Sequence, residues 1–399
     1  MLNDRYLSRY ADVLIWGLKT ARKERYKKGD IILVRFNLPA IQLAQIIDAK
    51  LLKLGMHTIV RLMPTPEMEK NFYSIANTKQ LKFQIPGDKE MISSINGGIF
   101  LFAPESLTHL SDIDPRKINT FSMARKPFND ILDKREEQGA FAWTLCVVPT
   151  NALAKHAGLD VDEYSRQIAR ACFLNRNAPV DHWRRIYKRA NTLKLRLNKL
   201  KTRYFHVESA SVDLNITPGK DRRWVGISGH NIPSFELFLS PDWRGTSGIY
   251  YADQPSYKNG NYVEGVRLEF REGEVVDVKA KKGEAFVKTQ ITMDKGSNKI
   301  GEFSLTDKTF SSINRFMANT LFDENFGGKQ GNCHIALGSS YSETYAGNQK
   351  TLTETKKTKL GFNDSALHWD LVNTEKKRVT AFGQQHEKLV IYENGKFKI

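Results

Sequence analysis

The chain has 399 residues, of which 40% are hydrophobic and 26% charged, and its formal net charge is +17. This length allows two domains with cores of their own. No stretch approaches the roughly 20 apolar residues that a membrane-spanning helix needs, which excludes a helical membrane protein. The positive charge permits a nucleic-acid partner, but we interpret it as a solvated basic surface.

The N-terminal segment carries an early acid and a short apolar run that is broken by Gly17 and Lys19. This pattern predicts an amphipathic helix rather than an export signal, so we expect a cytoplasmic protein. The three cysteines have no metal-binding or disulfide spacing, and we expect them to be reduced and buried: Cys146, Cys172 and Cys333.

The first half alternates apolar runs of strand length with stretches of helical periodicity. Residues 30–36 form the first predicted strand, and Pro39 can open the helix that follows. The alternation continues with strand 57–62, helix 66–76, and strands 98–102 and 141–148. Strands separated by helices favour parallel βαβ units, so we expect an open, doubly wound α/β domain. The loop after the first strand lacks glycine, which argues against a dinucleotide-binding motif.

Residues 179–202 have the periodicity of one long helix that is rich in arginine and lysine. We interpret it as an interdomain helix with a solvated basic face, and a nucleic-acid-binding helix is the alternative. It ends the first expected domain, residues 1–202. Four of its basic residues lie within two turns: Arg184, Arg185, Lys188 and Arg189.

From Tyr204 onward, short alternating segments are separated by turn signals such as Asn259-Gly260 and Asn394-Gly395. Asn-Gly between apolar runs is a strong hairpin signal. One helix is predicted at about residues 283–293. We therefore expect residues 203–399 to form a mainly antiparallel β domain, as a barrel or a strongly bent sheet.

Six side chains of metal-ligand type lie in this second half. His368 and Asp370 are two residues apart, so on a strand both side chains point to the same face. Polar groups inside apolar runs cost free energy unless something satisfies them, and a metal ion does so. The mixture of oxygen and nitrogen donors suits Zn, Co or Mn. The six residues are Glu236, Glu302, His334, Tyr341, His368 and Asp370.

Other histidines lack such a context, and we interpret His57, His182 and His386 as ordinary hydrogen-bonded or surface residues. Six short motifs surround the candidate ligands, in this order: GHNIPSFELFLSP, YVEGVRLEF, KIGEFSL, NTLFDEN, HIALGSSY and SALHWDLV. In order and approximate spacing they resemble the thermophilic-aminopeptidase family of metallopeptidases, the aminopeptidase T and aminopeptidase S type. The resemblance extends more loosely over the first half. One departure is Phe235, because the family usually has a small residue before the first glutamate.

The resemblance implies a homodimeric two-metal exopeptidase that acts on peptides with a free N-terminus. It also implies that the six candidate residues hold two divalent ions. We expect Glu302 or Glu236 to take the proton of the attacking water as well. Tyr341 is either a ligand or a hydrogen-bond donor. Two alternatives come from other classes, a basic nucleic-acid-binding protein and a metal-dependent phosphoesterase.

Overall fold

A computed structural model describes residues 1–385 and 387–399. His386, which was interpreted above as an ordinary residue, lies outside the described residues. The described chain divides into two compact units. The first unit comprises Met1–Tyr187 and Ile227–Ser234, and the second comprises Lys188–Gly226 and Phe235–Ile399. Helix α9 (Pro179–Lys199) contains the boundary between the two units, at Tyr187. The expected division after residue 202, into domains 1–202 and 203–399, stays a proposal.

The first unit is built on a parallel five-stranded sheet with the order β2-β1-β3-β4-β7. Its strands are β1 (Ile31–Phe36), β2 (His57–Leu62), β3 (Gly97–Phe102), β4 (Ala142–Val147) and β7 (Asn231–Ile232). The chain adds β2 on one side of β1 and β3 on the other. This is the doubly wound arrangement that the alternation of segments predicted, and it confirms that part of the fold.

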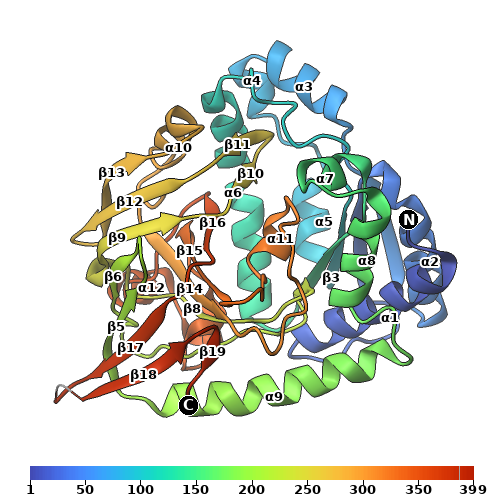
Figure 1. Ribbon diagram of the computed structural model, residues 1–399. Helices are drawn as coiled ribbons and strands as arrows, with labels where there is room; N and C mark the ends of the chain where they lie inside the picture. The colour runs from blue at the N-terminus through green and yellow to red at the C-terminus, as the bar shows by residue number, and fades with distance from the viewer. Residues whose placement is uncertain (386) are drawn as a thin grey trace. The chain divides into compact units, whose positions relative to one another are not determined.

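Helices lie on both faces of this sheet (Figure 1). α1 packs against β3 and β4, and α2 against β1 and β2. On the opposite face, Ile59 of β2, Met91 of α5 and Leu132 of α6 pack against a buried apolar cluster that contains Leu33 of β1. No helix among the described residues is long and apolar enough to cross a bilayer. The helices of this unit are α1 (Asp4–Ala21), η1 (Leu38–Ala40), α2 (Ile41–Lys53), α3 (Pro66–Ile75), α4 (Thr78–Leu81), α5 (Asp88–Ser94), α6 (Pro115–Glu137), α7 (Asn151–His156) and α8 (Val161–Ala171).

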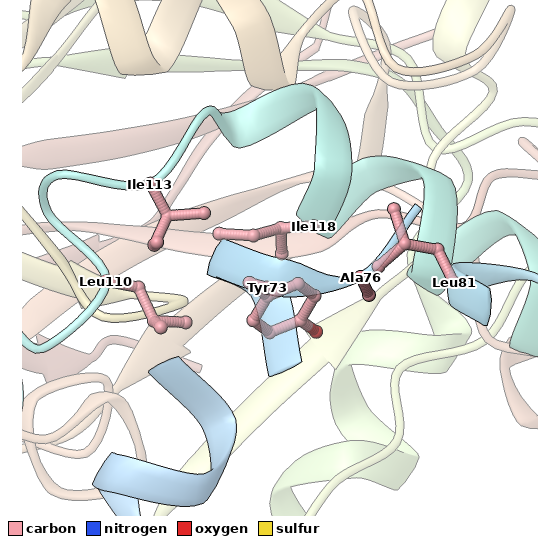
Figure 2. Packing of buried hydrophobic residues seen from close by; sticks show 6 residues of the cluster. All are labelled: Tyr73, Ala76, Leu81, Leu110, Ile113 and Ile118. Atoms are coloured by element: carbon pink, nitrogen blue, oxygen red, sulfur yellow. The ribbon is translucent and has the colours of Figure 1, made fainter. Parts of the chain in front are cut away.

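A small apolar cluster fastens α3 and α4 to the start of α6 (Figure 2). The ring of Phe121 on α6 lies edge-on to Tyr73 of α3, with centroids 5.9 Å apart. Burial of these side chains holds the start of α6 against α3 and α4. The cluster comprises Tyr73, Ala76, Leu81, Leu110, Ile113 and Ile118.

The second unit confirms the expected antiparallel β character, but it forms separate open sheets rather than one barrel. An eight-stranded sheet has the order β13-β12-β9-β6-β5-β17-β18-β19, a four-stranded sheet the order β16-β15-β14-β8, and β10 pairs with β11. The strands of the large sheet are β5 (Thr202–Glu208), β6 (Asp213–Ile216), β9 (Ser247–Ala252), β12 (Val266–Arg271), β13 (Glu274–Lys279), β17 (Arg378–Gly383), β18 (Lys388–Glu393) and β19 (Lys396–Phe397).

The second unit also contains the four-stranded sheet and several smaller elements. Its strands are β8 (Glu236–Leu239), β14 (Ile300–Thr306), β15 (Asn332–Gly338) and β16 (His368–Asn373). The remaining elements are η2 (Trp243–Gly245), β10 (Ser256–Lys258), β11 (Asn261–Val263), α10 (Glu284–Gln290), α11 (Thr320–Asp323), η3 (Ser342–Thr344), η4 (Gln349–Thr351) and α12 (Glu354–Lys359). Asn259 and Gly260 both adopt positive φ, at 50° and 68°, in the turn between β10 and β11. The predicted hairpin is thus present.

The two larger sheets pack face to face through aromatic side chains. The ring of Phe303 on β14 lies 6.0 Å from that of Phe205 on β5. The hydroxyl of Tyr250 on β9 donates to the carbonyl oxygen of Leu371 on β16 at 2.7 Å. Alternate residues of the four-stranded sheet therefore form the core of the unit, and the intervening residues point to the other face.

Candidate metal centre

Five of the six predicted side chains lie on that other face of the four-stranded sheet. Residues paired across antiparallel strands share a face. Glu302 on β14 pairs with Ala336 on β15, which pairs with Asp370 on β16. His334 lies two residues before Ala336, and His368 two residues before Asp370. The regular alternation of strands thus brings both histidines onto the face of Glu302.

Glu236 reaches the same face from the edge strand β8. It pairs with Thr306, which lies four residues after Glu302 on β14. Ser304, between them, donates a hydrogen bond from its hydroxyl to Glu236 Oε2 at 3.0 Å and so orients that carboxylate. Ser304 and Ala336 are the inner positions of the face. Both of these side chains are small.

The nitrogen and oxygen atoms of these side chains converge closely. Nε2 of His334 lies 3.1 Å from Glu236 Oε2 and 3.2 Å from Glu302 Oε1. Nε2 of His368 lies 3.4 Å from Asp370 Oδ1 and 3.7 Å from Glu302 Oε2. The two oxygens of Glu302 thus face different histidines.

Two groups of three residues emerge, each with its ligand atoms within 4.8 Å of one another. We call Glu236, Glu302 and His334 the inner triad, and Glu302, His368 and Asp370 the outer triad. Glu302 belongs to both. A carboxylate can give one oxygen to each of two neighbouring cations, so this arrangement fits a dinuclear centre with Glu302 as the shared ligand.

The two triads differ in their access to solvent. Glu236, Glu302 and His334 are 5%, 3% and 0% exposed. The side chains of His368 and Asp370 are 24% and 13% exposed, so the site opens on the side of the outer triad. A small pocket lies there, and its lining comprises Pro255, Ser256, Tyr257, Thr320, Asp323, Asp370 and Val372.

Tyr341 follows β15 and lies beside the outer triad. Its ring centroid is 4.8 Å from that of His368 and 5.8 Å from that of Phe238. Its backbone N–H donates to Ser240 Oγ at 2.8 Å. Burial and the nearby carboxylates raise the pKa of the Tyr341 phenol well above its ordinary value, so without bound ions the hydroxyl stays a neutral donor.

Glu324 belongs to the site although the sequence reasoning did not select it. It follows α11, is 5% exposed, and forms a third ligand-type group with His334 and Asp370. The adjacent Asn325 fixes this turn, since its Oδ1 accepts from the N–H of Phe235 at 2.5 Å. Phe235 is therefore tied to the site by its backbone, next to Glu236. The only sequence signal was an Asp-Glu-Asn run between apolar residues.

Lys258 is a second residue that sequence reasoning missed. Its Nζ donates to the backbone oxygen of His368 at 2.5 Å, and its charge faces Asp370. Burial lowers the pKa of Lys258, and the charge of Asp370 opposes this shift. Its contact with the first residue of β16 supports the strand that carries the outer triad.

The donor set fits divalent cations. Carboxyl groups that are buried together repel one another unless positive charge compensates them. Here four carboxyl groups lie with two imidazoles and the ammonium of Lys258, so that negative charge is in excess when all four carboxyl groups are ionised. Ions that accept oxygen and nitrogen donors remove this excess. The four carboxyl groups belong to Glu236, Glu302, Glu324 and Asp370.

Metal binding is expected to weaken as the pH falls toward and below about 7. Burial and the charge of Glu236 raise the pKa of Glu302 to about 7. Burial lowers the pKa of His334, but its hydrogen bonds to Glu236 and Glu302 outweigh burial and raise that pKa well above its ordinary value. Cations bind the deprotonated ligands, so protons compete with them, by up to about tenfold in affinity per pH unit for each proton displaced.

Calorimetric titration of zinc into chelator-treated protein at several pH values measures this effect. Binding should release protons, which buffers of different ionisation enthalpy reveal. An affinity that stays constant across this pH range, with no proton release, would contradict the expectation.

Comparison with known proteins identifies relatives along nearly the whole chain. A family model described as thermophilic metalloprotease (M29) matches residues 3–397. Aminopeptidase AmpS of Bacillus subtilis (strain 168) is 25% identical over 395 residues, which cover 92% of this chain and 94% of the relative. Aminopeptidase 2 of Geobacillus stearothermophilus is 28% identical over 280 residues, or 66% of each chain.

A solved structure shares the fold. Wild-type AmpT from Thermus thermophilus superimposes with a TM-score of 0.78 over 99% of both chains, at 20% sequence identity. The similarity confirms the expected fold class, with a parallel α/β part followed by mainly antiparallel sheets.

Proposed function

Since the chain belongs to the thermophilic metalloprotease (M29) family, we propose that it is a metallo-aminopeptidase that hydrolyses the N-terminal bond of peptides. The observation that carries this proposal is the pair of triads that share Glu302. Relatives named as aminopeptidases support the same activity. The matched family and these relatives favour this activity over a phosphoesterase or a nucleic-acid-binding protein, the alternatives that the sequence left open.

We assign two divalent ions to the centre, with the inner triad holding one and the outer triad the other. Zn, Co and Mn all suit these donors. Such ions make a bound water acidic, with a pKa near 7, and polarise the scissile carbonyl group. Tyr341 is proposed as a further ligand or as a hydroxyl donor to the reacting carbonyl oxygen.

A carboxylate must take the proton of the attacking water and pass it to the leaving amine. Glu302 and Glu236 are the residues expected from the sequence, and this role stays a proposal for both. Glu324 is a third candidate, and it belongs to neither triad that shares Glu302. A carboxylate outside the two triads keeps its basicity when ions occupy them, and Glu324 therefore offers a way to separate proton transfer from metal binding.

Glu324→Gln is expected to keep both ions and to lower kcat by about 10²- to 10⁴-fold, the usual contribution of a general base. The amide preserves the size of the side chain but cannot accept the proton. Steady-state kinetics and elemental analysis of the same preparation measure both effects. Glu354→Gln is the matched control, because Glu354 is exposed on α12. Loss of an ion from the Glu324 variant would instead make Glu324 a ligand, and an unchanged kcat would remove it from the mechanism.

Exopeptidase action is expected because the centre is enclosed on the side of the inner triad. Substrate must approach past His368 and Asp370, where a small pocket lies. A chain end fits such an approach better than an internal segment does. Acetylated peptides should therefore resist hydrolysis that their free counterparts undergo. Mass spectrometry of paired peptides tests this, and equal cleavage of both members of a pair would contradict it.

Two basic residues of helix α9 make contacts within the protein. Lys194 donates from Nζ to the carbonyl oxygen of Gly226 at 2.9 Å, and the guanidinium of Arg189 lies 4.9 Å from the ring centroid of Phe310. Both cations thus serve packing within the second unit. Arg184, with a side chain 66% exposed, remains in solvent. The homodimer and the cytoplasmic location expected from the sequence stay predictions.

A further inference from the structure

Three arginines surround one buried carboxylate in the first unit, which contains none of the metal-centre residues. Nη1 of Arg61 on β2 lies 3.1 Å from Asp88 Oδ1, and Nη1 of Arg125 on α6 lies 3.3 Å from Asp88 Oδ2. Arg35 on β1 is the third. Although it remains accessible to solvent, the protein atoms around its guanidinium lower its pKa, and the charges of Arg125 and Arg61 lower it further. We call these residues the arginine cluster.

The fold places the cluster on one face of the parallel sheet. Arg35 pairs with Arg61 across β1 and β2. Leu33 and Ile59 precede them by two residues. Leu33 belongs to the apolar cluster against which Ile59, Met91 of α5 and Leu132 of α6 all pack. The side chains of Arg35 and Arg61 therefore point to the face on which α5 carries Asp88 and α6 carries Arg125.

Aromatic rings hold two of the guanidinium groups in place. The guanidinium of Arg35 lies 5.7 Å from the ring centroid of Phe100 on β3. That of Arg125 lies 5.4 Å and 5.3 Å from the rings of Phe121 and Phe128 on its own helix. Such contacts restrict the side chains before any ligand binds. The apolar cluster of Figure 2 in turn fixes the start of α6.

The protein does not satisfy the charge or the hydrogen-bond donors of the cluster. Three positive charges face the single negative charge of Asp88, which leaves an excess of two. Each guanidinium carries five N–H donors. Among the described residues, Arg35 makes no hydrogen bond or ion pair through its guanidinium, and Arg61 and Arg125 each bond only to Asp88. The side chains of Arg61 and Arg125 are 45% and 28% exposed, so solutes can reach them.

The arginine cluster lies in the part of the sheet where doubly wound folds usually bind their ligands. The sheet order β2-β1-β3 places the change of winding direction between β1 and β3. Ligands of such sheets bind outside the carboxyl ends of the strands at this point. Arg35 and Arg61 are the second-last residues of β1 and β2. The loop after β1 lacks the glycines of a backbone phosphate cradle, so here only side chains can supply the donors.

We propose that Arg35, Arg61 and Arg125 form an anion site that binds the phosphoryl group of a small soluble molecule. Guanidinium groups match the oxygens of phosphate in a bidentate manner. A phosphomonoester carries about −1.5 to −2 charges at neutral pH, which matches the excess of the cluster. The carboxylate of Asp88 orients two of the three guanidinium groups, those of Arg61 and Arg125. The site is independent of the aminopeptidase activity.

Calorimetric titration of the metal-loaded full-length protein with inorganic phosphate tests the proposal, with chloride at matched ionic strength as the blank. Arg35→Met removes one guanidinium group without breaking a hydrogen bond between described residues of the protein. Asp88→Asn removes the one negative charge of the cluster and weakens the contacts that hold the guanidinium groups of Arg61 and Arg125. Arg184→Met is the control with the same loss of charge on an exposed helix. Phosphate that binds at the metal centre instead would be released by a chelator, and Arg35→Met would not change its affinity. These two results distinguish the metal centre from the arginine cluster.

The expected result is saturable binding that Arg35→Met weakens by about tenfold or more, the usual effect of losing a charged hydrogen bond. Asp88→Asn should tighten it, and Arg184→Met should leave it unchanged. Wild-type protein without saturable binding would overturn the proposal, as would equal binding by the Arg35 variant or equal loss in the control. If the Asp88 variant fails to fold, the Arg35 variant decides. Binding to vesicles that contain phosphatidic acid, without binding of free phosphate, would also overturn it.

Discussion

Replacing Glu302 by glutamine is expected to strip the centre of both ions and to lower kcat/KM by roughly three orders of magnitude. Glu302 is the residue that both triads share, with one oxygen toward His334 and the other toward His368. An amide has the same shape but offers one neutral oxygen. Metal ions contribute several kcal/mol to a reaction of this type, and about 1.4 kcal/mol corresponds to each tenfold in rate.

The Glu302 variant should remain folded, because the core of its unit lies on the opposite face of the sheet. Far-ultraviolet circular dichroism and a thermal scan check this. Glu354→Gln, an exposed change of the same type, serves as the control. Comparison with Glu324→Gln completes the test, since that variant is expected to lose rate but not metal. A Glu302 variant with a full complement of ions and the wild-type rate would move the centre elsewhere in the molecule.

Removal of the ions by a chelator is expected to abolish turnover and to lower the melting temperature together. Without ions, the buried carboxyl groups of Glu302 and Glu324 lose the positive charge that favours their ionised form, and burial raises the pKa of both. An ion present at a hundredfold excess over its dissociation constant stabilises the folded state by about 2.7 kcal/mol. Differential scanning calorimetry with and without EDTA measures this loss.

The matched control is EDTA already saturated with the ion that the protein holds, which should leave the rate unchanged. Zn, Co and Mn should then be restored one at a time, and the order of recovered rates identifies the best metal. A protein that keeps its full rate and melting temperature after all bound metal has been removed would contradict a metal-dependent mechanism.

Local sequence patterns predicted much of the first unit. Strand β2 (His57–Leu62) has the predicted bounds, and β1 starts one residue later than expected. Strand β7 (Asn231–Ile232) escaped prediction because its two residues pair with β4 from a distant part of the sequence. Helix α6 was missed because it has many charged residues and an internal proline, Pro127, both of which obscure helical periodicity.

The sequence predicts those parts of the metal centre whose residues lie close together in the chain. The spacing of His368 and Asp370 places both on one face of any strand. The approach of Glu236 to Glu302 depends on the register of β8 with β14, which no local pattern encodes. Glu324 follows a short helix without periodicity, and Lys258 reaches the site from a separate hairpin. These two residues could be found only once the strands were placed.

Elemental analysis combined with stoichiometric reconstitution tests the central proposal most directly. Protein stripped of metal is titrated with the preferred ion, and bound metal and aminopeptidase rate are measured at each addition. The two triads predict a rate that is absent at the start and reaches its maximum when about two ions are bound per chain. A maximal rate in protein that contains no metal, or binding of ions without any gain in rate, would contradict the proposed dinuclear centre.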